Sequence, residues 1–459
     1  MGITRITVII TTILGAFTAL GSASAAQKAS TAQWVGSWEY VAAPLPPGET
    51  PPVAPLGAAP ALTPLDAPGA VAGPARAVGF PPPRIDNPGN VPLDTSAADL
   101  SNVTLREVIR TSVGGERLRL RFSNEDGAEA LVLGSVHVAE AAADGSIVPG
   151  TDHVVQFDGH AGVILPASSP VLSDAVDLTT RPLEKLYVSV YLPRTLALRA
   201  QRSLFEYIAG QPGDFSGADS LPQVHLKRVP SLLTLLEVQT SRPTEVVVAL
   251  GDSITEGATS TANAFRSWPD RLAERLASQD WAVANAGISG NRLLRYGAGP
   301  SALARLDRDV LSVPGVRTVV LMEGINDIGR SFAPVGASDP VTVQALEAAD
   351  LQIISRAHEH GIRVIGATLT PYQGAAYASP AGESAREALN SWIRSSGAFD
   401  GVIDFAPVVA APDNPLTFAP GYNDRDHLHP NDAGYKALAD AIDLSVITGS
   451  RPSKASRRR

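Results

Sequence analysis

The pattern of apolar and polar positions changes near residue 241. Upstream of it, between Val103 and Val238, short runs alternate apolar and polar residues, most strictly at 118–122 and 186–192. Such alternation is typical of strands with one buried face and one face in water. Turn-forming pairs such as Gly114-Gly115 separate the runs. The pattern predicts an all-β domain, a sandwich or jelly-roll-like fold of antiparallel strands, with further strands at 34–40, 131–133 and 135–138.

Downstream of Ser241-Arg242-Pro243, the apolar residues occur in longer unbroken runs that alternate with helical periods. The run 246–250 has no polar position, which indicates a parallel strand buried on both faces. Trp268, Leu272 and Leu276 are four residues apart, as on one face of a helix. Alternating strands and helices predict an α/β domain with a parallel sheet and right-handed crossovers. The other expected strands are 282–284, 316–322, 363–369 and 402–405, and the other helices are 345–360 and 432–442.

The first 26 residues have the composition of a secretory signal peptide. Arg5 precedes an apolar run from Ile6 to Leu20, and the small residues Ala23-Ser24-Ala25-Ala26 follow it. The alternative is a membrane anchor, but the run contains threonines and is shorter than the ~20 residues that a span needs. We therefore expect export, to a periplasm or outside the cell, with no membrane span after cleavage.

These patterns divide the 459 residues into four segments. We expect a signal peptide at 1–26, an all-β domain at 27–240, an α/β domain at 241–448 and a basic tail at 449–459. Within the β domain, residues 42–95 are rich in Pro, Ala and Gly, which disfavours helices and central strands and predicts an extended insertion. The chain has no cysteine, so disulfides do not stabilise the exported protein.

The charge of the chain narrows the classes of partner. The formal net charge is -9 at pH 7 and the pI is about 5.4. Nucleic acids and anionic membranes recruit basic surfaces, so neither is an expected partner. The sequence gives no indication of the oligomeric state.

A candidate nucleophile follows the first strand of the α/β domain. Ser253 comes directly after Val246–Gly251 and Asp252, where open α/β sheets place the residues that handle ligands. The alternative is that Asp252 or Ser253 only caps the next helix.

A serine needs a base and a carboxylate that orients the base. Near the C-terminus, Asp426 and His429 are three residues apart, so both side chains can point the same way from one turn. Asp424 and His427 have the same spacing. Pro430 favours His429, because proline suits the first position of the following helix. The remaining alternative for this acidic loop is a cation site.

Two loops could supply donors to an oxyanion. Gly290 lies in Asn285–Asn291, where a glycine lets a backbone N–H approach a substrate. Asn326 lies in Glu323–Asp327 and carries a side-chain amide. Either loop alone would be an ordinary turn after a strand.

Taken in order, four short blocks resemble those of the SGNH, or GDSL-type, hydrolase family. The blocks are Gly251-Asp252-Ser253, Gly290, Gly324-Ile325-Asn326-Asp327 and Asp426-His427-Leu428-His429-Pro430. The resemblance covers about Glu245 to Ile447. It implies a three-layer α/β hydrolase domain and an ester hydrolase without cofactor or metal. Ser253 would be the nucleophile, Asp426 and His429 would complete a triad, and Gly290 and Asn326 would be oxyanion donors beside the Ser253 N–H.

The upstream part resembles the β domain of some secreted bacterial esterases grouped with xylan-acetylesterase-like proteins. The residues that carry this looser resemblance are Trp34–Trp38 and Val103–Glu107. It implies O-acetyl groups on a polysaccharide such as xylan as the substrate. The alternatives are a lipase or arylesterase, and a carbohydrate-binding protein without activity. Aromatic residues that line the cleft would favour sugar, and the candidates are Trp268, Tyr296, Tyr372 and Trp392.

Overall fold

The computed structural model describes residues 32–41, 43, 84–88, 90–94, 100–125, 127–194, 204–334, 336–337, 340–423 and 425–449. The expected signal peptide, most of the insertion at 42–95 and all of the basic tail except Gly449 lie outside the described residues. Among the helices in the described ranges, none is both long and apolar enough to cross a membrane.

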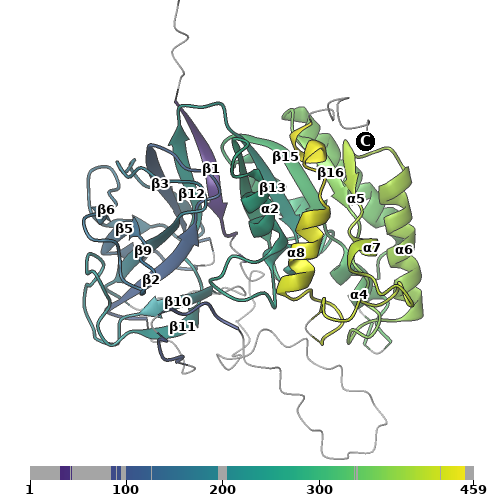
Figure 1. Ribbon diagram of the computed structural model, residues 1–459, viewed down its shortest axis with the longest axis horizontal. Helices are drawn as coiled ribbons and strands as arrows, with labels where there is room; N and C mark the ends of the chain where they lie inside the picture. The colour runs from purple at the N-terminus through teal and green to yellow at the C-terminus, as the bar shows by residue number, and fades with distance from the viewer. Residues whose placement is uncertain are drawn as a thin grey trace, which may run out of the picture. The chain divides into compact units, whose positions relative to one another are not determined.

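Five parallel strands form the sheet of the C-terminal part, in the order β14-β13-β15-β16-β17. Their bounds are β13 (Glu245–Gly251), β14 (Trp281–Gly287), β15 (Val316–Met322), β16 (Arg363–Ala367) and β17 (Gly401–Ile403). Figure 1 labels β13, β15 and β16 of this sheet. The side chains of residues 246–250 are fully buried, because helices cover both faces of a sheet of this kind. The predicted parallel sheet is therefore present.

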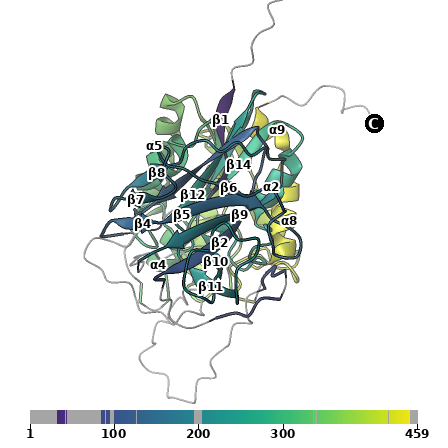
Figure 2. The same ribbon diagram turned by 90° about the vertical axis from the view of Figure 1, so that its left-hand side faces the viewer.

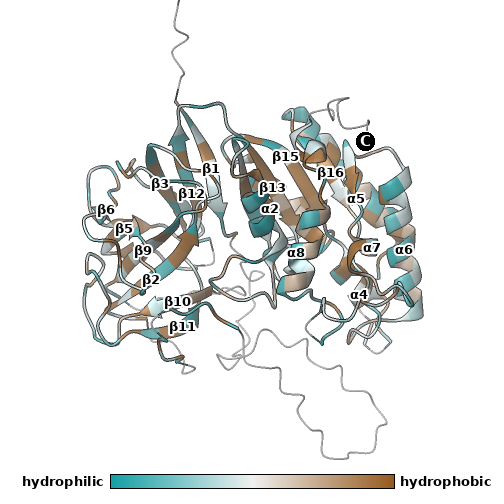
Figure 3. Ribbon diagram, in the orientation of Figure 1, coloured by the Kyte–Doolittle hydropathy of each residue, from teal (hydrophilic) through white to brown (hydrophobic). Residues whose placement is uncertain are grey.

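The helices of this part form two groups. Helices α2 (Trp268–Leu276) and α8 (Asp432–Ala441) pack against each other, and α5 (Val343–Glu359) packs against α3 (Ala302–Leu306) and α6 (Pro380–Ser395). Right-handed crossovers in this strand order place the groups on opposite faces of the sheet. Figure 3 shows apolar strands between helices with polar outer faces. The shorter helices are α1 (Ser253–Glu256), α4 (Ile325–Ser331), α7 (Ala406–Val409) and α9 (Leu444–Thr448), and a π-helical turn, η1, spans Asp307–Leu311.

The N-terminal part consists of antiparallel strands (Figure 2). One sheet has the order β1-β12-β3-β8, a second β11-β10-β2-β9-β5-β6, and β4 pairs with β7. In β3 (Arg117–Ser123), Leu118, Leu120 and Phe122 are fully buried between arginines, so the predicted alternation is present. The jelly-roll-like connectivity stays a prediction. The other strands are β1 (Gln33–Glu39), β2 (Val103–Arg110), β4 (Leu131–Leu133), β5 (Ser135–Glu140), β6 (His153–Val154), β7 (Val163–Leu165), β8 (Pro170–Leu172), β9 (Lys185–Leu192), β10 (Leu204–Ile208), β11 (His225–Val229) and β12 (Leu233–Thr240).

Strand β1 shows a departure from simple alternation. The pairing of β1 with β12 shifts register between Gly36 and Trp38. Because a bulge moves the following side chains to the other face, Val35, Gly36 and Ser37 are all buried, whereas Trp34 and Trp38 are half-buried.

Strand β1 also joins the antiparallel and parallel parts. It packs beside β14, and the Gly36 N–H donates to the carbonyl of Pro314 at 2.9 Å. Ser112 Oγ accepts from the backbone N–H of Val283 at 3.0 Å. Apolar residues of both parts belong to one continuous core, and the described residues form one compact unit. The boundary between residues 240 and 241 stays a prediction.

Candidate active site

The site lies where the strand order reverses. The chain runs from β13 to β14 at one side and then crosses to β15 at the other, so a crevice is expected beyond the carboxyl ends of β13 and β15. Gly251 pairs with Met322 and with Gly287. Ser253 and Gly324 therefore lie two residues beyond paired positions, and Gly290 lies three residues beyond β14.

Ser253 is held at the start of α1. The Asp252 side chain caps this helix by accepting from the Ile254 N–H at 2.8 Å, so the capping role belongs to Asp252 and leaves the Ser253 side chain for other contacts. Ser253 is 5% exposed. As the first residue of the helix it has no intrahelical carbonyl for its N–H, which can therefore serve a bound oxygen.

The loop from Asn423 to Asn431 turns sharply enough to direct two side chains to one side. Arg425 and His427 adopt the left-handed region, with φ of 77° and 59°, which non-glycine residues enter at a cost. Asp426 Oδ1 accepts the N–H groups of Leu428 and His429, each at 2.9 Å. Aspartate stabilises tight turns by such bonds to the following residues, and here the turn sets the direction of the His429 ring.

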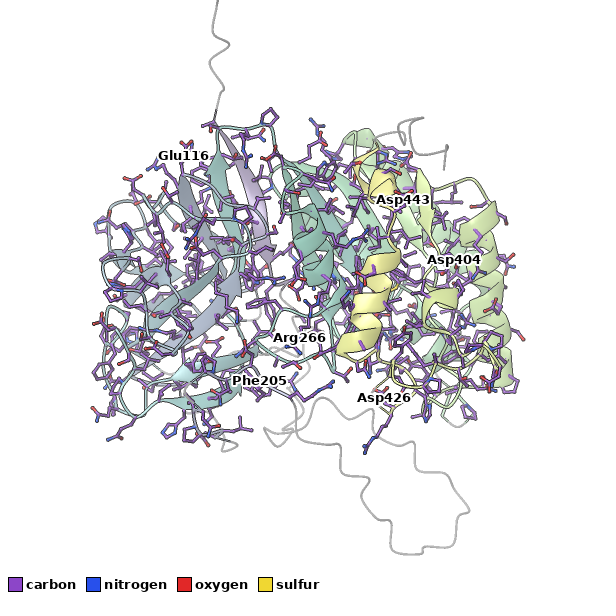
Figure 4. All side chains as sticks on the ribbon, viewed as in Figure 1. Glu116, Phe205, Arg266, Asp404, Asp426 and Asp443 are labelled. Carbon is purple, nitrogen blue, oxygen red and sulfur yellow. The ribbon has the colours of Figure 1, made fainter. Side chains whose placement is uncertain are left out.

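A continuous chain of hydrogen bonds connects three of the predicted residues. His429 Nδ1 lies 2.5 Å from Asp426 Oδ2, and His429 Nε2 lies 2.7 Å from Ser253 Oγ. Because an ionised carboxylate only accepts, Nδ1 carries the proton and Nε2 accepts from the serine hydroxyl. His427 is exposed, and Asp424 lies outside the described residues. Figure 4 shows Asp426 and Asp443 at opposite ends of α8.

Asp426 is ionised over the range in which an esterase works. Burial alone would raise its pKa, but the hydrogen bond from the His429 ring, the charge of that ring and the backbone N–H groups of His429 and Leu428 lower the pKa to about 2. The carboxylate can therefore hold the imidazole in one tautomer and stabilise the imidazolium that forms when His429 takes a proton.

This pKa has a consequence for stability. Its value in the folded protein, about 2, is below the ordinary 3.8, so the folded state binds the proton less tightly than the unfolded state. The stabilisation is present above about pH 4 and is lost as the pH falls through 2. We expect Asp426→Asn to lower the free energy of unfolding by about 2 kcal/mol at pH 7 and by about half of that at pH 3. Urea unfolding of both proteins at the two pH values measures this, and a difference that does not shrink at pH 3 would contradict it.

The two predicted oxyanion loops lie on either side of Ser253 along the sheet edge. Gly290 has φ of 75°, a conformation that glycine adopts without strain. Its N–H has no hydrogen-bond partner in the described part of the chain. Gly324, with φ of 118°, caps α4 and presents Asn326 in the first turn. Asn326 Nδ2 donates one N–H to the Asn291 carbonyl at 2.9 Å, which leaves its second N–H for a ligand.

Two buried carboxyl groups, those of Asp252 and Glu323, directly precede Ser253 and Gly324 in the chain. Burial, together with the charge of Asp327, raises the pKa of Asp252 to about 7, opposed by the Ile254 N–H and by the charges of His429 and Arg305. Burial and the charges of Asp252 and Asp327 also raise the pKa of Glu323 well above its ordinary value.

Arg305 is a site residue that the sequence did not reveal. Its side chain is fully buried and pairs with Asp309 at 3.0 Å. It donates to the carbonyls of Gly251 at 2.9 Å and Ala286 at 2.7 Å, and to Asn291 Oδ1 at 3.0 Å. One guanidinium therefore ties the ends of β13 and β14 to the loop that carries Gly290. The only sequence signal was an Arg and an Asp four residues apart, which many surface helices contain.

Two of the four candidate cleft aromatics, Trp268 and Tyr372, are buried in the core, and Trp392 is half-buried against it. Trp268 packs against Phe405 with ring centroids 5.5 Å apart, and Tyr372 is 1% exposed. Trp392 packs against Phe399 at 5.6 Å. Tyr296 is half-buried in the loop after β14, and its place in a cleft stays a prediction. Within the described ranges, no three His, Cys, Asp or Glu side chains come together as metal ligands would.

Comparison with known families agrees with this arrangement. Residues 249–437 match the model of the GDSL-like lipase/acylhydrolase family. These residues form a GDSL-like acylhydrolase domain. The matched segment contains all five predicted site residues and ends within α8. The chain is accordingly a carboxylic ester hydrolase, and the antiparallel strands lie outside the matched segment of the GDSL-like domain.

Several solved structures resemble the GDSL-like domain. A lipolytic protein of the G-D-S-L family from Desulfitobacterium hafniense is 25% identical, with 43% of this chain and 97% of that chain covered and a TM-score of 0.34. An acetyl xylan esterase is 21% identical over 44% and 99% of the two chains, with a TM-score of 0.34. A psychrotrophic esterase from Pseudoalteromonas sp. is 18% identical over 45% and 98%, with a TM-score of 0.34. Such similarities support no inference about substrate. Among curated proteins nothing matches the chain.

Proposed function

We propose that this protein is an exported serine ester hydrolase that works through an acyl-enzyme and removes O-acetyl groups from a polysaccharide such as xylan. The observation that carries the catalytic part is the hydrogen-bond chain from Asp426 through His429 to Ser253, with contacts of 2.5 Å and 2.7 Å. A hydroxyl within hydrogen-bond reach of an oriented imidazole is the arrangement that activates a serine nucleophile.

The reaction proceeds in two halves. Ser253 Oγ attacks the ester carbonyl while its proton passes to His429 Nε2, and the carbonyl oxygen becomes an oxyanion. As the intermediate collapses, the bond to the alcohol breaks and His429 gives the proton to the leaving oxygen. A water molecule then attacks the acyl-serine, again losing its proton to His429. Acetate leaves, and Ser253 regains its proton.

The N–H groups of Ser253 and Gly290 and the second N–H of Asn326 hold the oxyanion in both halves. They come from the loops after three neighbouring strands of the sheet, β14, β13 and β15, and this common origin supports the assignment. Donors that are already fixed stabilise the charge as it forms, without reorganisation.

Support for a short acyl group comes from what surrounds Ser253. The Ser253 hydroxyl bonds to His429, which in turn bonds to Asp426, so the described hydrogen-bond partners on this side of the serine are polar. A long acyl chain needs an apolar pocket. Two hollows of the described residues are lined by antiparallel strands and their loops, and neither includes a residue of the triad. Export and the polysaccharide substrate rest on the leader and on the upstream resemblance.

A panel of esters tests this proposal. We expect acetate release from acetylated xylan, and faster hydrolysis of p-nitrophenyl acetate than of p-nitrophenyl esters with long acyl chains. A preference for long chains would instead favour the lipase alternative. No cleavage of any ester would contradict the proposal and favour the carbohydrate-binding alternative.

The oxyanion role of Asn326 leads to a separate expectation. Replacing Asn326 by alanine removes one donor, and we expect kcat to fall by about 10²- to 10³-fold with little change in KM, because the donor acts on charge that exists only in the transition state. Steady-state kinetics on p-nitrophenyl acetate measures this. Asn390→Ala offers a comparison, since this buried asparagine binds the Leu369 backbone instead. An Asn326→Ala enzyme with the kcat of the wild type would exclude the role.

A further inference from the structure

The amide of Asn326 is held at both ends. Its Nδ2 donates to the Asn291 carbonyl at 2.9 Å, and its Oδ1 accepts from the hydroxyl of Tyr377 at 3.3 Å. The two contacts agree on which end of the amide is nitrogen. They also leave a single amide N–H without a bond, and this is the group to which the proposed function assigns the oxyanion.

Tyr377 is built into the core rather than the surface. It follows β16 in the chain, is 6% exposed, and packs beside Tyr372 with ring centroids 5.9 Å apart. Its ring also lies against Gly329 of α4, where an added Cβ would meet ring atoms at 2.5 Å. The ring is therefore fixed against the helix that carries Asn326, and its hydroxyl has little freedom to move.

The hydroxyl of Tyr377 can only act as a donor to Asn326. In the described part of the chain its one hydrogen-bond partner is Asn326 Oδ1. Burial, and next the negative charge of Asp252, raise the pKa of Tyr377 well above its ordinary value, so the phenol keeps its proton. A protonated phenol beside a carbonyl oxygen donates to it.

An asparagine side chain needs such partners to hold one orientation. The torsion that rotates the amide plane is broad and has no deep minima of its own. The Asn291 carbonyl fixes the nitrogen end, and Asn291 is itself held by Arg305 at 3.0 Å. Without a donor at Oδ1, the amide could rotate about this single anchor and turn its second N–H away from the oxyanion.

We propose that Tyr377 is a positioning residue for ester hydrolysis: its hydroxyl fixes and polarises the Asn326 amide so that the remaining N–H faces the oxyanion. The inference rests on the proposed function, because it takes Asn326 to be an oxyanion donor. Tyr377 does not touch the reacting atoms. The contact of 3.3 Å belongs to the free enzyme, and catalytic hydrogen bonds often shorten when a transition state is bound.

The test is Tyr377→Phe, which removes only the hydroxyl. We expect kcat to fall about tenfold, with KM within about twofold of the wild type. A misdirected amide stabilises the oxyanion less well, but the loss is smaller than the 10²- to 10³-fold loss expected when the donor is removed altogether. Affinity for a boronate that forms a tetrahedral adduct with the serine should fall in proportion. Rates are expressed per active site titrated with a fluorophosphonate, so that loss of folded enzyme does not lower them.

The chain offers a matched control in Tyr372→Phe. Tyr372 is the neighbouring buried ring, and its hydroxyl has no hydrogen-bond partner in the described residues. We expect this variant to keep the kcat of the wild type. If kcat fell equally in Tyr377→Phe and Tyr372→Phe, the loss would come from a change in packing rather than from the bond to Asn326. That result would overturn the inference.

A double-mutant cycle decides whether Tyr377 acts through Asn326. In the Asn326→Ala background, Tyr377→Phe should cause no further loss of kcat. A tenfold loss that persists in that background, or a Tyr377→Phe enzyme as fast as the wild type, would overturn the inference while the proposed function stands. If Asn326→Ala alone leaves kcat unchanged, the oxyanion assignment of the proposed function fails and the inference fails with it.

Discussion

Replacing Ser253 by alanine is expected to lower kcat by about 10⁴- to 10⁶-fold, which leaves only the rate that bound substrate and oxyanion donors supply. The loss is large because the acyl-enzyme path needs the Oγ atom itself, which lies 2.7 Å from His429 Nε2. The fold should survive, because Asp252 rather than Ser253 caps α1. Steady-state kinetics on p-nitrophenyl acetate, at a protein concentration determined by absorbance, measure the change.

Ser289→Ala is a suitable control for this substitution. Ser289 lies in the loop after β14, and the described contacts of this residue include its backbone N–H but not its hydroxyl. We expect that variant to keep most of its activity. If Ser253→Ala retained more than about one hundredth of the wild-type kcat, another nucleophile would be at work and the role of Ser253 would have to be abandoned.

Replacing His429 by alanine is expected to have a comparable effect, a fall in kcat of about 10⁴- to 10⁶-fold. No other described side chain is hydrogen-bonded to Ser253 Oγ, so the hydroxyl loses its base. Asp426 keeps its bonds from the backbone of Leu428 and His429, and the turn should therefore persist.

The same loop supplies the control for His429. His427 is two residues away and exposed, and its ring lies against Gly374. We expect His427→Ala to retain activity within about tenfold of the wild type, since the described hydrogen bond of Ser253 Oγ goes to His429 and not to His427. Kinetics of both variants on one ester decide which histidine is the base. A fully active His429→Ala together with an inactive His427→Ala would assign that role to His427 instead.

The strands of the α/β part could be predicted because their sequence pattern is local. Residues 246–250 are apolar without interruption, and β13 contains them all. Helix α2 was visible from its apolar spacing and starts at the expected Trp268. The helix at 380–395 was not predicted. Its apolar face is narrow, and Arg386 lies on the buried side, where Leu369 O accepts from it at 2.8 Å.

Of the candidate site, only the residues that belong to short local motifs could be predicted from the sequence. The spacing of Asp426 and His429 showed that they could share a turn, and Pro430 favoured this pair over its neighbour. No sequence pattern, however, links Tyr377 to Asn326 or Arg305 to Gly251, since these partners are 51 and 54 residues apart. Such contacts depend on the order of the strands, which brings distant loops together at one edge of the sheet.

Ester hydrolysis through an acyl group on Ser253 is tested most directly by covalent labelling. The wild-type protein is treated with a fluorophosphonate, digested, and the modified residue is located by mass spectrometry while esterase activity is followed. We expect one label per chain, on Ser253, and loss of activity in proportion to the labelling. The label should form rapidly in His427→Ala and much more slowly in His429→Ala. A label on another residue that accompanies the loss of activity, or full activity in a protein labelled at Ser253, would contradict this mechanism.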